Sequence, residues 1–382
     1  MKDIASLLAS SNQLKQLYAP VTLRIADPLD KQTLEKLIQQ GDVLFIHDEI
    51  YGQLQELIKS DRPSVKIAEE EYAELVTKHL AGKNINEYGV WVYYPWAKRM
   101  VHLLDEDEFV EVRTNRNRNK ITREEQQVLK SKKVGVVGLS VGQSIALTMA
   151  MERVCGELRL ADFDAAELSN LNRIRTGTHN LGLNKTVIAA REIAEIDPFI
   201  KVTIFDDGLN QQNMDDFFTA NGKLDLFIEV CDGLDIKLDS RFKAKQLQVP
   251  VVMDTNDRGM LDVERFDLEK DRSILHGMLD AFIKDDAIVI TDENRRAILM
   301  SIVSFDSLSE RMKLSMAEIG KSINTWPQLA SSVVLGGAIT TDIARKILLG
   351  EHQQSGRYYV DLDAIFKDRQ PAKLSGVPFD TN

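Results

Sequence analysis

The sequence predicts an α/β protein in which a small α+β region precedes a doubly wound, mostly parallel sheet. From residue 133 onward, short apolar strands alternate with longer amphipathic segments, the pattern of a parallel sheet covered by helices on both faces. Before residue 113, helical and strand-like segments follow no such alternation. The 382 residues, 43% of them hydrophobic, suffice for two domains with buried cores.

The first region is expected to span residues 1–112 and to form an α+β domain of unknown role. Its expected helices are residues 30–40 and 69–80, and its expected strands are residues 42–49, 88–96 and 109–114. The polar, basic stretch 113–120 precedes a helical segment at 121–133, so we place a domain junction there. The second domain then spans residues 113–370, and residues 371–382 form a C-terminal tail.

The second domain is expected to begin with buried strands separated by helices. The strands are residues 134–138, 157–164, 201–205, 224–232, 249–254 and 258–267. Residues 268–321 have mainly the composition of charged helix, and residues 326–351 that of a long helix rich in small residues. Gly336 and Gly337 indicate close packing of that helix, and residues 357–366 form a last strand.

Charge and cysteine content exclude several classes of protein. Lys and Arg total 48 against 59 Asp and Glu, and the net charge of -11 disfavours a nucleic-acid partner. The cysteines, Cys155 and Cys231, form no CxxC pair, so neither a disulfide framework nor a zinc site is encoded. The N-terminus lacks the basic-then-apolar order of a signal peptide, and no apolar run matches a membrane span. We therefore expect a soluble cytoplasmic protein with no membrane partner.

A glycine-containing turn follows the first strand of the second domain. The strand meets the turn at Gly138, and a helical segment follows Gly142. Helix-start N–H groups in this position bind phosphate in Rossmann-like nucleotide-binding domains. Ser140 occupies the middle position of the G-x-G-x-x-G pattern, so the glycines alone equally allow a plain turn without a ligand. Gly138, Ser140 and Gly142 are candidate nucleotide-binding residues.

Two acids end the second strand of this domain. Asp162 lies 24 residues after Gly138, close to the spacing at which a carboxylate bonds a ribose hydroxyl. Asp164 follows two positions later and is a second candidate for nucleotide binding. The alternative interpretation is a solvated strand end.

Three further polar side chains follow, at the carboxyl edge of the predicted sheet. They are Asn170, Arg173 and Lys185. Arginine offers phosphate a planar fork and lysine a point charge. Each cation alone could be a surface residue, but the cluster favours a polyphosphate site.

Asp232 ends a later strand at the same edge. A carboxylate that faces phosphates requires a cation between them, so Asp232 is a candidate Mg²⁺ ligand. The alternative is an N-cap for the helical segment that starts at Gly233. Cys231 lies within the apolar strand and Cys155 in a helix-to-strand turn, so both are expected to be core residues.

Taken in order, these motifs resemble the ThiF/MoeB family of adenylating enzymes, which includes the ubiquitin-activating enzymes. The resemblance spans roughly residues 113–366 and implies a ThiF-type adenylation domain that binds ATP and Mg²⁺. The matching segments are VGVVGLSVGQ, LADFD, LSNLNR, LGLNK, EIDP, EVCD and VPVVMD, followed by the late small-residue helix and YYVDLDAIF.

The resemblance also implies roles for single residues. Asp162 would hold the ATP ribose, Asn170, Arg173 and Lys185 would contact the phosphates, and Asp232 would bind magnesium. The family supplies one more arginine from the N-terminal arm of a dimer partner. Arg116 is the better match to it and Arg118 the alternative, so the resemblance implies a homodimer.

This sequence departs from the family pattern in two respects. Ser140, Val141 and Gln143 stand where family members have further glycines, and no cysteine follows Cys231. The paired CxxC zinc site of many relatives is also absent. We therefore expect an ATP-dependent adenylyltransferase that activates a carboxylate as an acyl adenylate, and no transfer through a cysteine. The carboxylate belongs to a protein C-terminus or a small molecule.

Other functions also fit part of the pattern. An NAD-dependent dehydrogenase would explain the turn and Asp162, but not the S-N-L-N-R motif, the downstream lysine or Asp232. A catalytically silent nucleotide-binding scaffold would fit the missing glycines and cysteine. Within the enzyme class, dehydration of a modified tRNA base is a further option, against which the acidic charge weighs.

Overall fold

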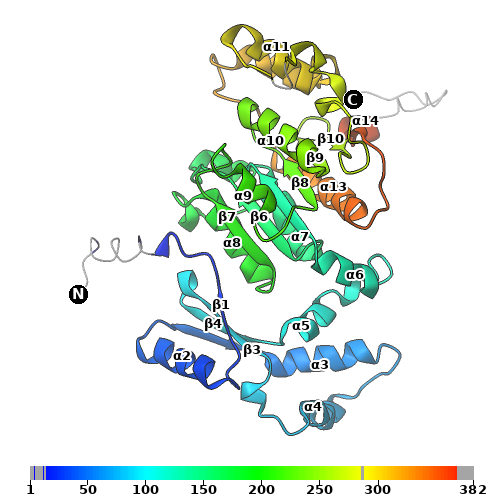
Figure 1. Ribbon diagram of the computed structural model, residues 1–382. Helices are drawn as coiled ribbons and strands as arrows, with labels where there is room; N and C mark the ends of the chain where they lie inside the picture. The colour runs from blue at the N-terminus through cyan, green and yellow to red at the C-terminus, as the bar shows by residue number, and fades with distance from the viewer. Residues whose placement is uncertain (1–3, 5–11, 13, 285–287, 368–382) are drawn as a thin grey trace, which may run out of the picture.

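The computed structural model describes residues 4, 12, 14–284 and 288–367, and its strands form a four-stranded and a seven-stranded sheet. Figure 1 shows the smaller sheet, near the N-terminus, below the larger one. The predicted tail at residues 371–382 lies outside the described residues.

The smaller sheet has the strand order β1-β3-β4-β2. Its strands are β1 (Val21–Leu23), β2 (Phe45–Asp48), β3 (Val90–Tyr94) and β4 (Arg99–Leu103), and its helices are α2 (Pro28–Gln39), α3 (Ile50–Asp61) and α4 (Tyr72–Leu80). The structure confirms both predicted helices and two predicted strands, while β1 and β4 were not predicted. Tyr94 and Trp96 donate hydrogen bonds to the Ala194 carbonyl (3.2 Å) and the Glu195 carboxylate (2.7 Å), so this sheet packs on the helix that carries both acceptors.

The prediction of a strand at residues 109–114 is wrong, because this segment is the second half of helix α5 (Glu106–Arg113). The Asp105 carboxylate caps the helix by accepting the first helical N–H at 2.7 Å, and acidic residues fill the first turn. Phe109 and Val112, three positions apart, pack against the same apolar cluster. The local apolar alternation fits a strand, but the cap and the packing face select a helix.

The larger sheet has the strand order β11-β10-β9-β8-β5-β6-β7. β5 to β9 pair in parallel, whereas β10 is antiparallel to both β9 and β11. This confirms the predicted doubly wound, mostly parallel sheet. The strands are β5 (Lys133–Val137), β6 (Glu157–Ala161), β7 (Lys201–Phe205), β8 (Leu226–Glu229), β9 (Val251–Thr255), β10 (Met260–Glu264) and β11 (Gly356–Tyr359).

The winding direction of this sheet reverses between β5 and β8. β6 and β7 lie on one side of β5, and β8 and β9 lie on the other. Helices α7 (Gly142–Glu152), α8 (Lys185–Ile196) and α13 (Ala330–Leu348) contribute to the apolar cluster on one face, and α9 (Met214–Thr219) and α10 (Leu234–Leu247) to that on the other. Open α/β sheets bind ligands at such a reversal, outside the carboxyl ends of the strands. The turns after β5 and β8 are therefore the expected binding position.

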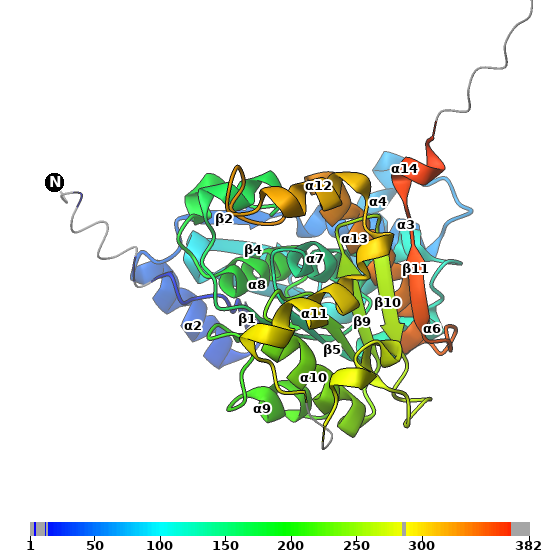
Figure 2. The same cartoon turned by 90° about the horizontal axis from the view of Figure 1, so that it is seen from above.

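The segment between β10 and α13 crosses this carboxyl edge. The prediction that residues 268–321 are mainly helical is only partly correct. Helices α11 (Asp292–Val303) and α12 (Glu310–Glu318) lie in this range, but its described residues before Asp292 form only two short 3-10 helices, Ile274–Gly277 and Asp280–Phe282. Figure 2, seen from above, shows both helices lying over the main sheet. No helix in the described ranges is both long and apolar enough to cross a membrane.

The prediction of a last strand at residues 357–366 is only partly correct. β11 ends at Tyr359, and a short helix, α14 (Leu362–Ile365), follows. Asp361 ends the strand because its carboxylate caps this helix, accepting the Ala364 N–H at 3.2 Å.

Candidate functional site

The turn after β5 packs directly against the segment that follows β8. Gly138 has a φ of +88°, and a Cβ there would lie 2.6 Å from the Val230 carbonyl oxygen. A Cβ on Gly142 would lie 2.8 Å from a Val136 methyl group and 3.2 Å from the Val230 side chain. Both glycines are thus required for the close approach of the two loops at the point where the winding reverses.

Helix α7 starts at Gly142 without a side-chain cap, because its N-cap residue is Val141. No capping side chain therefore competes for the N–H groups at its start, which favours an anion there. Gln143, which replaces a family glycine, is buried and donates to the Glu192 carboxylate at 2.8 Å and to the Arg175 carbonyl at 3.2 Å. This substitution ties the start of α7 to α8 and to the Arg175 loop.

The Asp162 carboxylate stabilises the glycine turn through two hydrogen bonds. Its Oδ2 accepts the Leu139 N–H at 2.6 Å, and its Oδ1 accepts the Asp164 N–H at 2.8 Å. Burial raises the pKa of the Asp162 carboxyl, while the charge of Lys185 and the two N–H donors oppose that shift. From the sequence, Asp162 was expected only to bind a ribose; its two hydrogen bonds show that it also stabilises the turn.

Lys185, Asp164 and Asn170 lie beyond the end of β6. Lys185 is the first residue of α8, and its Nζ lies 2.7 Å from Asp164 Oδ2 and 4.0 Å from Asp162 Oδ1. Asn170 is buried, and its Oδ1 accepts the Glu167 N–H at 3.0 Å, which shapes the loop. The predicted contacts of Lys185 and Asn170 with phosphate remain predictions.

Arg173 joins the glycine turn to the end of β8. Its Nε donates to Ser140 Oγ at 3.0 Å. Burial lowers the pKa of the Arg173 guanidinium, and the charge of Asp232 opposes this shift. Ser140, to which Arg173 donates, lines the same cavity as Asp232. Ser140, Arg173 and Asp232, from three separate segments, therefore converge at one place.

Asp232 is exposed and does not cap helix α10, because Gly233 is its N-cap residue and no side chain caps it. The alternative interpretation of Asp232 as a helix cap is therefore wrong. In the described part of the chain, no three His, Cys, Asp or Glu side chains form a preformed metal site. Mg²⁺ is commonly held by one or two carboxylates together with substrate phosphates and water, so an exposed Asp232 fits Mg²⁺ that arrives with a nucleotide.

The predicted arm, residues 113–120, lies between α5 and α6 (Arg123–Lys130). Arg116 is exposed, on the turn Asn115–Asn117, whereas Arg118 pairs with Glu111 of its own chain. Arg116 is therefore the freer of the two candidates to reach a second subunit.

A cavity of about 220 Å³ lies beside Ser140 and Asp232. Asp254, at its wall, is 4% exposed, and neither carboxylate oxygen has a hydrogen-bond partner among the described residues. From the sequence, residues 249–254 were expected only to form a strand, and Asp254 was not a candidate site residue; the available signal was a second acid at a strand's carboxyl end. The apolar lining is Val141, Val230, Met253, Met260, Leu299, Ile302, Val303, Leu308, Met312, Trp326 and Pro327.

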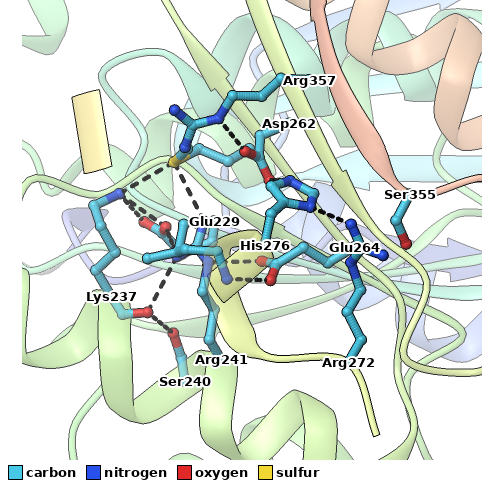
Figure 3. A network of polar contacts seen from close by, with 12 residues as sticks. Glu229, Lys237, Ser240, Arg241, Asp262, Glu264, Arg272, His276, Ser355 and Arg357 are labelled. Carbon is cyan, nitrogen blue, oxygen red and sulfur yellow. Dashed lines mark hydrogen bonds and ion pairs between the residues drawn. The ribbon is translucent and has the colours of Figure 1, made fainter. Parts of the chain in front are cut away.

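A buried ionic network lies behind this cavity (Figure 3). Glu229, the last residue of β8, accepts hydrogen bonds from Lys237 Nζ at 2.7 and 2.8 Å and from Arg241. Arg241 also donates to Glu264 at 2.9 Å. Burial by itself would raise the pKa of Glu229, but the two cations outweigh it and lower this pKa to about 2. Glu229 also accepts the Cys231 N–H at 2.9 Å, so the network fixes the backbone that leads to Asp232.

The cysteines lack the properties of nucleophiles. Cys155 is fully buried, as predicted, and burial raises its pKa to about 12. Cys231 is only half-buried and lines the cavity, so its expected core position is partly wrong. Burial and the charge of Glu229 nevertheless raise the pKa of its thiol, which disfavours the reactive thiolate.

Two of the relatives found by comparison with known proteins cover much of the chain. "Uncharacterized protein MT1398" of Mycobacterium tuberculosis is 44% identical over 288 residues, which cover 75% of this chain; the chain spans only 40% of that protein's length. The tRNA threonylcarbamoyladenosine dehydratase of Bacillus subtilis is 22% identical over 244 residues, covering 61% of this chain and 95% of that protein.

Among solved structures, E. coli tRNA N6-threonylcarbamoyladenosine dehydratase, TcdA, matches with a TM-score of 0.46 and 17% identity, covering 65% of this chain and 98% of that one. The family model described as ThiF family matches residues 114–273, which carry the glycine turn, Asp162, Arg173, Lys185 and Asp232. The similarity to the ThiF family therefore covers the segment that carries the candidate site.

Proposed function

We propose that this protein is an ATP-dependent adenylyltransferase that converts a carboxylate into an acyl adenylate and releases pyrophosphate. The observation that carries this proposal is the convergence of Ser140, Arg173 and Asp232 beside the uncapped start of α7. An uncapped helix start, an arginine and an exposed carboxylate together suit a nucleotide that brings both phosphate charge and a divalent cation.

Each residue of the cluster then has a task toward ATP. Asp162 would accept a ribose hydroxyl with its remaining lone pairs, since an ionised carboxylate offers about four. Phosphate oxygens would be bound by Arg173, Lys185 and Asn170. Lys185 is paired with Asp164, so its ammonium group would either leave Asp164 or bind Asp164 and a phosphate together. The turn beneath the phosphates would be formed by Gly138, Ser140 and Gly142. Asp164 would bind the nucleotide next to Asp162, on the side of the ribose.

The reaction depends more on electrostatic stabilisation of negative charge than on proton transfer. The substrate carboxylate attacks the α-phosphate, and it is already ionised at neutral pH, so no general base is required. The barrier comes from bringing two anions together and from charge on the leaving pyrophosphate, which Arg173 and Lys185 would stabilise. Mg²⁺ held by Asp232 would neutralise phosphate charge when bound.

The proposal includes a homodimer in the cytoplasm. Arg116 of one subunit would supply a further cation to the phosphates of the other, and its exposure on the arm supports this. The substrate would be a protein C-terminus or a small carboxylic acid. A tRNA-linked substrate is a second candidate, suggested by the relative named as a tRNA threonylcarbamoyladenosine dehydratase, although the net charge of -11 opposes it.

The rival functions explain less of the site. A dehydrogenase or a silent scaffold gives no reason for Arg173 to hydrogen-bond to Ser140 in the cavity wall that also holds Asp232, and the family match favours neither.

Exchange of labelled pyrophosphate into ATP tests the proposal. With a panel of carboxylic acids, we expect at least one acid to support exchange and Arg173→Ala to reduce it about 10²- to 10³-fold, the usual effect of losing one transition-state cation or donor. Lys201→Ala is the matched control, because Lys201 begins β7 at the opposite edge of the same sheet and is exposed there. Equal exchange by Arg173→Ala and the wild type would refute the site.

A further inference from the structure

Three residues in the wall of the cavity beside Asp232 carry buried oxygens that lack hydrogen-bond donors among the described residues. In the described structure these are both carboxylate oxygens of Asp254, Asn256 Oδ1 and Gln328 Oε1. A buried acceptor without a partner is destabilising, and more so when it is charged. Four such acceptors around one space indicate that a ligand supplies the missing donors.

The position of Asp254 ties this acceptor group to the proposed reaction. Ile228 of β8 pairs with Val252 of β9, so Asp254 lies beside Val230, two residues before Asp232. On its other side Asp254 packs against helix α13, where a Cβ on Gly336 would lie 2.2 Å from Oδ2. Helix and strand thus enclose the carboxylate close to the segment that carries the proposed magnesium ligand.

The charges that line the cavity favour a cation. Asp232, Asp254 and Asp257 face it together with Lys237. Lys237 is already paired with Glu229, and Asp257 accepts hydrogen bonds from Ser309, so Asp254 is the buried charge left without a partner. An ammonium group carries three donors, no acceptor and a positive charge, which matches this lining.

We infer that this cavity is the carboxylate-substrate subsite and that Asp254, with Asn256 and Gln328, binds an ammonium group on the same substrate. The substrate class is then an amino acid or another small amino-carboxylate. The volume of about 220 Å³ lies below the roughly 300–1,000 Å³ of clefts for drug-sized ligands, and apolar side chains form much of the remaining wall. This inference rests on the proposed adenylation, which places the carboxylate end of the substrate near Ser140 and Asp232.

Paired probes that differ only in the ammonium group test the inference. The full chain with MgATP would be titrated calorimetrically with leucine against 4-methylpentanoate, and with 6-aminohexanoate against hexanoate, which place the ammonium at two distances from the carboxylate. At least one amino acid should bind about tenfold or more tightly than its partner, because a buried charge-assisted hydrogen bond contributes roughly 1.5–3 kcal/mol. Asp254→Asn should abolish that preference while leaving MgATP affinity unchanged.

Two further variants separate a substrate contact from a general structural effect. Asn256→Leu should weaken the preference less than Asp254→Asn, and Asp215→Asn, an exposed acid on α9, should leave it intact. The inference is overturned if neither amino acid binds better than its partner, or if Asp254→Asn keeps the preference. Because MgATP binding is measured in the same samples, failure of the adenylation proposal would be seen separately, as loss of nucleotide binding in the wild type.

Discussion

Glu229 and Asp254 are buried carboxylates on neighbouring strands, and they have opposite surroundings. Glu229 is fully buried and meets two cations, which lower its pKa to about 2. Asp254 has no hydrogen-bond partner within the described part of the chain, and burial raises its pKa to about 7. A carboxylate that is already paired has its ligands within the fold, whereas one left unpaired beside a cavity is arranged for a ligand from outside. Glu229 therefore supports the site, and Asp254 marks its substrate end.

Removing a cation from the buried ion pairs of Glu229 should have the largest effect on the stability of the protein. Arg241→Met leaves Glu264 without its cation and Glu229 with only one, so we expect a loss of about 3–5 kcal/mol in the free energy of unfolding. Urea denaturation would measure it. Lys31→Met removes an exposed ion pair with Glu87 and should change stability by less than about 0.5 kcal/mol. Similar values for the two variants would contradict the importance of the buried network.

Filling the space beside the Asp254 carboxylate should have an intermediate effect on stability. Gly336→Ala would place a methyl group 2.2 Å from Asp254 Oδ2, so helix α13 or the carboxylate must shift, at about 1–3 kcal/mol. Gly52→Ala, the same change in helix α3 with no atom closer than 4.0 Å, should be neutral or stabilising. Thermal unfolding distinguishes them, and equal stability of the two variants would show that α13 does not enclose Asp254 tightly.

Removing the charge of Asp254 itself should have the smallest effect on stability, and it should stabilise the protein instead of destabilising it. Asp254→Asn should stabilise the ligand-free protein by about 1–2 kcal/mol near pH 8. Between its unfolded value of 3.8 and its folded pKa of about 7, Asp254 keeps a proton only in the folded state, so its contribution to stability falls as pH rises through this window. The advantage of the variant over the wild type should therefore grow over this range.

Glu229 should show the reverse pH dependence. Its folded pKa of about 2 lies below the unfolded value of 4.5, so its contribution is complete above pH 4.5 and is lost as pH falls toward 2. Comparing Glu229→Gln and Asp254→Asn across pH measures both slopes. If the stability contributions of Glu229 and Asp254 changed with pH in the same direction, the two carboxylates would not have opposite surroundings. The other charged groups that line the cavity with Asp254 are Asp232, Lys237 and Asp257, and they are unchanged in both variants.

The sequence predicted the elements governed by local pattern and failed where distant contacts decide. The parallel strands and the order of Gly138, Asp162, Arg173 and Asp232 follow from periodicity and family motifs. Residues 109–114 were mistaken for a strand because alternation does not reveal the cap at Asp105 or the packing of α5.

Tertiary contacts likewise hid part of the candidate site. Nothing in the sequence near Asp254 shows that β9, α13 and α11 surround it. Likewise, the partners of Glu229 come from α10, eight and twelve residues later, and their convergence depends on how α10 packs on the sheet.

Calorimetric titration of the full chain with MgATP and, separately, with NAD⁺ tests most directly whether a nucleotide binds at the reversal between β5 and β8. We expect the wild type and Lys201→Ala to bind MgATP alike, Arg173→Ala to bind it at least about tenfold more weakly, and none of the three to bind NAD⁺ comparably. Preference for NAD⁺, or MgATP binding unaffected by Arg173→Ala, would contradict an MgATP site there.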